Sequence, residues 1–171
     1  MKKIALILIS LLTTITVFSQ DHLTFMGLSI DGTTKDFSKK LNNKQFKTIE
    51  YLSFCNGIKL NGMFLHNDSC TIFLLDGSSS KKFDEVVVQF LSIDDVEFLN
   101  IKYDAFISIY TDKYGEPTEN RRNNIISQNS VTWILDNGTI NMWLLKPKNI
   151  IVIKYIDKIN SIKPIEINPD I

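Results

Sequence analysis

The sequence is poor in the residues that most often carry chemistry. Its 171 residues include only two histidines and two cysteines. Its seven glycines fall at turns and strand bulges and form no phosphate-binding loop, and no serine stands in a Gly-x-Ser-x-Gly elbow. A stable zinc site needs three or four ligands, which these few residues do not supply at a suitable spacing. The sequence therefore predicts no catalytic residue, no metal site and no cofactor.

An excess of charge of one sign is also missing. The chain has 19 basic and 19 acidic side chains. Loss of Lys2 and Lys3 with a cleaved leader would leave 17 basic against 19 acidic side chains, a net charge near −2. Nucleic-acid-binding domains usually carry clustered basic charge. We therefore expect no nucleic-acid partner.

No apolar run is long enough for a transmembrane helix, which needs roughly 20 residues. The longest run, residues 4–18, follows Met1-Lys2-Lys3 and precedes Ser19-Gln20. A basic start, a short apolar stretch and a small residue at the end are typical of a secretory signal peptide. The sequence predicts a signal peptide over 1–19, export to the periplasm or the extracellular space, and no stable membrane span after cleavage.

The mature chain is predicted to be one α+β domain over 20–160, followed by an extended tail over 161–171. Two similar halves, at about 23–98 and 99–157, each contain a helix and then an antiparallel meander, packed as one compact unit. The arrangement as one sheet or two stays open. The expected helices cover 34–43, with Thr33 as N-cap, and 99–114, with Asp95 among the caps and Gly115 as the stop. The expected strands are 47–54, 58–65, 70–76, 84–91, 131–135, 139–145 and 149–156.

Apolar residues mark the buried face of the second helix. They recur with helical spacing, which predicts one buried stripe: Leu99, Tyr103, Phe106, Ile107, Tyr110 and Tyr114. From Lys158 onward periodicity is lost, and two prolines favour an extended or frayed end.

The two cysteines, Cys55 and Cys70, invite a disulfide because the protein is expected in an oxidising compartment. The predicted meander places them at opposite ends of an eight-residue strand, which spans over ~20 Å. A bridge needs Cα atoms within about 7 Å. We therefore expect no intramolecular bridge, and we expect Cys70 to be a small buried hydrophobe.

The two tryptophans lie on strands joined by a predicted turn at Asn137-Gly138. That turn pairs Trp133 with Met142 and places Trp143 on the opposite face of the hairpin. We expect Trp133 in the core and Trp143 as the better contact candidate, because an exposed indole offers a large rigid surface to a protein or a sugar. Packing of both indoles in the core is the alternative.

The segment from His66 to Cys70 contains an imidazole, a carboxylate and a thiol within five residues. One interpretation is a polar turn, because Asn67, Asp68 and Ser69 readily bond to their own backbone. The alternatives are a metal site or a thiol–imidazole pair of His66 and Cys70. With Trp143, His66 and Asp68 are the possible contact residues.

Five segments of the mature chain stand out together: 22–33, 61–64, 70–72, 113–117 and 155–160. In these segments the chain resembles an uncharacterised family of small secreted proteins from gut Gram-negative anaerobes. The resemblance implies export and a fold but no activity. Members of that family often carry a cysteine in the second half, where this chain has none. The layout also resembles the tandem α+β repeats of beta-lactamase-inhibitor-like proteins.

These observations favour an exported, non-catalytic binding module for an envelope protein or a glycan. Contact would run through a sheet face or through the loops at 66–69, 77–82 and 118–129. The alternatives are a hydrolase or thiol enzyme built on His66 and Cys70, and an accessory protein of envelope assembly.

Overall fold

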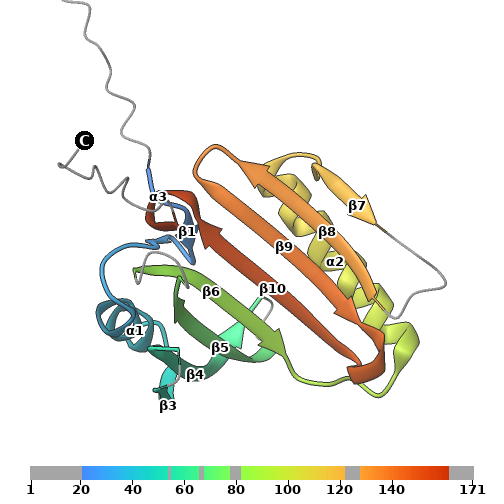
Figure 1. Cartoon of the computed structure of the whole chain (residues 1–171). Helices are drawn as coiled ribbons and strands as arrows, with labels where there is room; N and C mark the ends of the chain where they lie inside the picture. Colours follow the sequence, from blue (N-terminus) through green and yellow to red (C-terminus); the bar gives the residue numbers. More distant parts are fainter. Residues whose placement is uncertain (1–20, 54, 66–67, 78–81, 122–127, 162–171) are drawn as a thin grey trace, which may run out of the picture.

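A computed structural model describes residues 21–53, 55–65, 68–77, 82–121 and 128–161. The predicted signal peptide, His66 and the chain after residue 161 lie outside these ranges. The described chain forms one large antiparallel sheet, a small hairpin and three α-helices (Figure 1).

The small hairpin pairs β1 (Thr24–Phe25) with β2 (Leu28–Ser29), and the helices are α1 (Thr34–Asn42), α2 (Val96–Tyr114) and α3 (Lys158–Ser161). A 3-10 turn, η1, covers Lys146–Lys148. The large sheet contains β3 (Lys47–Leu52), β4 (Gly57–Phe64), β5 (Asp68–Asp76), β6 (Phe83–Phe90), β7 (Glu119–Arg121), β8 (Gln128–Leu135), β9 (Gly138–Leu145) and β10 (Ile150–Asp157).

The order of the large sheet is β3-β4-β5-β6-β10-β9-β8-β7, and every neighbouring pair is antiparallel. The pairing of β6 with β10, which are far apart in the chain, joins two meanders into one continuous sheet. The predicted α+β class is therefore wrong, because the described chain is mostly β. Local patterns revealed the strands, but the class depended on this long-range pairing.

Both long helices begin after predicted N-cap residues, and α2 ends at its predicted stop. Thr33 Oγ1 accepts a hydrogen bond from the Asp36 backbone N–H at 3.1 Å, and Asp95 accepts bonds from two backbone N–H groups at the start of α2. Gly115 ends α2 with φ of 82°, a conformation that favours glycine. The predicted N-caps and helix stop are confirmed.

The chain after β10 differs from its prediction. Instead of an extended end from Lys158, α3 follows directly. Asn160 is 8% exposed, and its side-chain amide donates to the backbone carbonyls of Ile30 and Phe83. These tertiary bonds hold α3 against the sheet, so the loss of hydrophobic periodicity was a poor guide here.

Buried Asp157 fixes the start of the described chain to the end of β10. Its carboxylate accepts from the Leu23 backbone N–H at 2.7 Å and from the Asn160 backbone N–H at 2.9 Å, and it contacts His22 Nδ1 at 3.0 Å. A buried carboxylate is tolerated where such donors surround it. These contacts position the β1–β2 hairpin over the sheet.

Candidate functional site: the open face of the sheet

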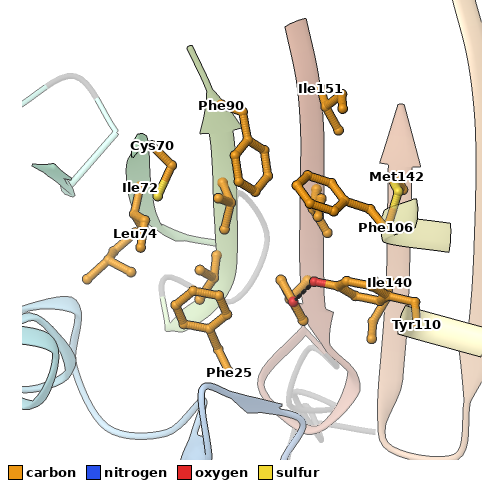
Figure 2. Packing of buried hydrophobic residues seen from close by; sticks show 14 of the residues in the cluster. Phe25, Cys70, Ile72, Leu74, Phe90, Phe106, Tyr110, Ile140, Met142 and Ile151 are labelled. Carbon is orange, nitrogen blue, oxygen red and sulfur yellow. Dashed lines mark hydrogen bonds between the residues drawn. The ribbon is translucent and has the colours of Figure 1, made fainter. Parts of the chain in front are cut away.

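Side chains of the long strands alternate between two very different environments. Along β6, β9 and β10, buried residues alternate with half-buried ones almost without exception. The buried set, with residues such as Ile72, Val88 and Met142, packs together with residues of α1 and α2 in one core cluster. Figure 2 shows Cys70, Ile72 and Leu74 in a row beside Phe90, with Phe106 and Tyr110 of α2 close by. This is the covered face of the sheet.

The other set of side chains forms what we call the open face. In Figure 1, α2 lies behind β8 and β9, so these strands are seen from the open side. Strand register places a broad apolar group on this face, with cross-strand pairs such as Phe73–Val87 and Val152–Trp143. Its apolar members on β4, β5, β6, β8, β9 and β10 are Met63, Phe73, Leu75, Val87, Ile134, Trp143, Leu145, Ile150, Val152 and Ile156.

Polar side chains on the open face bond to their neighbours within the sheet. Lys154 Nζ lies 2.8 Å from Glu85 Oε2, across β10 and β6. Thr132 donates to Asn141 Oδ1 at 2.9 Å, and Thr71 donates to Asn61 Oδ1 at 3.0 Å. Side chains held in this way lose less conformational entropy when a partner binds. The open face is therefore partly preorganised for contact.

The open face is almost electrically balanced. Register places four basic residues on it, Lys47, Lys59, Arg121 and Lys154, and three acidic residues, Glu50, Glu85 and Glu119. The difference, 4 − 3, is one positive charge. Nucleic-acid recognition calls for a strongly basic face, and this face is not one.

Trp143, the predicted contact residue, lies half-buried near the middle of β9 on the open face. Trp133 is 1% exposed on the covered face, and its Nε1–H donates to the Gly115 carbonyl at 3.0 Å. The prediction that the two indoles occupy opposite faces is confirmed. The predicted register was wrong, because Trp133 pairs with Ile140 and the turn is Asp136-Asn137. A register error of two residues preserves the face of every side chain.

The other predicted contact residues do not gather at the open face. Asp68 begins β5 and accepts from Lys102 Nζ of α2 at 2.5 Å, so it ties a strand to a helix on the covered side. The Lys102 ammonium lies about 6 Å from the ring centroids of three phenylalanines, Phe90, Phe98 and Phe106. His66, the third predicted contact residue, lies outside the described residues.

Cys70 is suited to packing and not to nucleophilic chemistry. It is 3% exposed, and burial, with a smaller contribution from the charge of Asp68, raises the pKa of its thiol to about 12. A catalytic cysteine needs a lowered pKa and solvent access. Cys70 pairs with Gly62 across β5 and β4, whereas Cys55 precedes the other end of β4. Both thiols are free.

The part of the chain that the structure describes offers few other candidate metal or ligand sites. No group of three or more His, Cys, Asp or Glu side chains there is arranged to hold a metal ion. A pocket of about 410 Å³ beside the β3 edge contains Lys35, Tyr51 and Ser53, but no buried titratable group faces it. Among the described helices, none has the length and apolar character needed to cross a membrane.

Comparison of the chain with protein-family models, curated proteins and solved structures found no match. The candidate site therefore rests on the geometry of this chain alone. Sequence reasoning identified Trp143 but missed its cross-strand neighbour Val152 and the Phe73–Val87 pair of the adjacent row. One signal was present in β6, where the consecutive residues Val86, Val87 and Val88 place an apolar side chain on each face.

Proposed function

We propose that this protein is an exported, non-catalytic binding module that holds a folded protein partner on the open face of its sheet. The observation that carries the proposal is two apolar cross-strand pairs, Phe73–Val87 and Val152–Trp143, which lie in adjacent rows of a face that no described helix covers. Interface centres are enriched in large aromatic and apolar side chains inside a polar rim. The signal-like start of the sequence supports export.

The dimensions of the open face favour a protein over a glycan. Six long strands spaced ~4.8 Å apart, each about eight residues at ~3.3 Å, give a surface of roughly 750 Å². A standard protein–protein interface buries about 800 Å² on each partner. Balanced charge and internal hydrogen bonds suit a partner surface that is also nearly neutral. The partner class is therefore a folded envelope protein with an apolar patch.

Co-purification from the native envelope after mild crosslinking, followed by mass spectrometry, tests this proposal. We expect one stoichiometric protein partner whose crosslinks map to the strands of the open face. Trp143→Ala should reduce its recovery at least tenfold, because central aromatic residues of interfaces often contribute 2 kcal/mol or more. Phe98→Ala is the matched control, because Phe98 is 52% exposed on α2, away from the open face.

Three outcomes would contradict the proposal. One is recovery of the partner with Trp143→Ala at the wild-type level. Another is a crosslinked product that contains only a second copy of this chain. The third is retention of a glycan in place of a protein, which would make the open face a sugar-binding surface.

A further inference from the structure

A small cavity lies on the covered side of the molecule, away from the open face. Its volume is about 100 Å³, and it is bounded by the tip of the β1–β2 hairpin, the end of β4 and the C-terminal half of α2. Met26, Phe64, Leu65 and Ile109 provide apolar walls. Met26 reaches this position because residues 26 and 27 both have positive φ, which turns the hairpin tightly.

Two buried tyrosines line the same cavity, Tyr110 of α2 and Tyr155 of β10. Each is 3% exposed, and their hydroxyls hydrogen-bond to each other. Figure 2 shows Tyr110 directed from α2 towards the strands. Two hydroxyls that share one hydrogen bond use only one of their two protons. The described residues offer neither hydroxyl a second partner, so one donor is left unused at the cavity.

The tyrosine pair acts as a donor at any physiological pH. Burial is the main cause that raises the pKa of Tyr110 and of Tyr155 well above the usual value for tyrosine. Both hydroxyls therefore stay protonated. A buried donor without an acceptor is costly, and an acceptor that enters the cavity would remove that cost.

An exposed cationic side chain borders the cavity. Lys113 lines it, and its Nζ lies 4.9 Å from the centroid of the Tyr114 ring, which is another lining residue. Across the ranges that the structure covers, no carboxylate lies within ion-pair distance of Lys113. An ammonium and an unused hydroxyl proton at one cavity both favour an anion, and the apolar walls favour a hydrocarbon group.

We propose that this cavity binds a small monocarboxylate with a short apolar chain. One carboxylate oxygen would accept from the tyrosine pair, and the carboxylate would face Lys113. The chain would lie against Met26, Phe64, Leu65 and Ile109. The size fits, because a 150 Å³ apolar cavity is known to hold benzene, and a cavity of about 100 Å³ suits a slightly smaller group. A multiply charged anion would lack donors at the apolar walls.

An NMR titration with butyrate as the probe tests the proposal. The protein is expressed as the full chain with its own predicted signal peptide and is purified after export. We expect saturable shifts of cavity resonances, and affinity for the neutral analogue butan-1-ol at least tenfold weaker. Lys113→Gln should weaken butyrate binding roughly tenfold, because a hydrogen bond to a charged group is lost. Lys148→Gln, an exposed lysine of η1, is the matched control and should bind as the wild type does.

The tyrosine pair needs a double variant. In a single Tyr110→Phe variant the Tyr155 hydroxyl would still have a free proton, so we expect little loss of affinity. Tyr110→Phe combined with Tyr155→Phe removes both donors and should weaken binding tenfold or more. Equal binding of butyrate and butan-1-ol would overturn the proposal. So would unchanged affinity in Lys113→Gln, or the absence of saturable shifts.

Discussion

The two faces of the sheet are built from the same strands but differ in what covers them. On the covered face, buried side chains from both halves pack with α1 and α2 into one core. On the open face, the intervening residues include apolar side chains such as Phe73, Val87 and Val152, yet no described element covers them. An apolar face that stays uncovered after folding is a candidate for contact with another molecule. Under the proposed function, alternate positions of single strands would serve stability and recognition.

The two tryptophans give the sharpest test of this division. Trp133→Ala should lower the free energy of unfolding by about 3–5 kcal/mol, because it leaves a large cavity in the core. Trp143→Ala should lower it by about 1 kcal/mol or less, because only cross-strand contacts are lost. Urea unfolding of both variants measures the difference. Equal costs for the two substitutions would show that the open face is covered in solution.

Neighbouring residues of β4 provide a second comparison. Gly62 faces the core, where an added Cβ would lie 2.2 Å from Cδ1 of the Phe46 ring. Phe46 is 2% exposed and has little room to move. Gly62→Ala should therefore destabilise the protein by about 1–3 kcal/mol. Asn61→Ala, at the adjacent exposed position, should change stability by less than about 0.5 kcal/mol. Thermal unfolding of the two variants checks this, and a harmless Gly62→Ala would contradict the close packing of Phe46.

A buried carboxylate of β6, Asp84, makes stability depend on pH. Asp84 is 3% exposed, and its Oδ1 has no hydrogen-bond partner among the residues that the structure describes. The pKa of the Asp84 carboxyl is raised to about 6, mainly by burial. The charges of Glu85, Asp157 and Asp76 also raise this pKa, whereas Lys154 lowers it. Between about pH 4 and 6 the folded protein holds a proton that the unfolded chain has lost, so this group makes stability fall as pH rises through that range.

Asp84→Asn removes that ionisation. The variant should exceed the wild type in unfolding free energy by about 2 kcal/mol at pH 7.5, and the difference should vanish near pH 4. Denaturant unfolding at the two pH values measures it. A variant that is less stable than the wild type at pH 7.5 would show that the Asp84 carboxylate has a stabilising partner.

The smallest effect is expected for the Glu85–Lys154 pair of the open face. Its side chains are 22% and 26% exposed, so water and salt weaken their attraction. A double-mutant cycle with Glu85→Gln and Lys154→Met should give a coupling energy of about 0.5 kcal/mol that decreases at 1 M salt. A coupling above about 2 kcal/mol would mean that the pair is more deeply buried than its exposure indicates.

Much of the local structure was predictable because it depends on local chemistry. Thr33, Asp95 and Gly115 fix the helix ends, and the spacing of Leu99, Tyr103 and Phe106 predicted the buried side of α2 correctly. Strand β7 and the start of β8 were missed because they are polar. Their extended shape comes from hydrogen bonds to the next strand, which no local hydrophobic pattern reports.

The sequence by itself determined the capped helices, most strands and the opposite faces of Trp133 and Trp143. Those features follow from side chains within a few residues of one another and from the two-residue period of a strand. Tertiary structure alone decided that β6 pairs with β10, that Asn160 holds α3, and that only one apolar face of the sheet is covered. Consecutive valines in β6 suit either face, so only the packing of α1 and α2 on one side distinguishes core from contact surface.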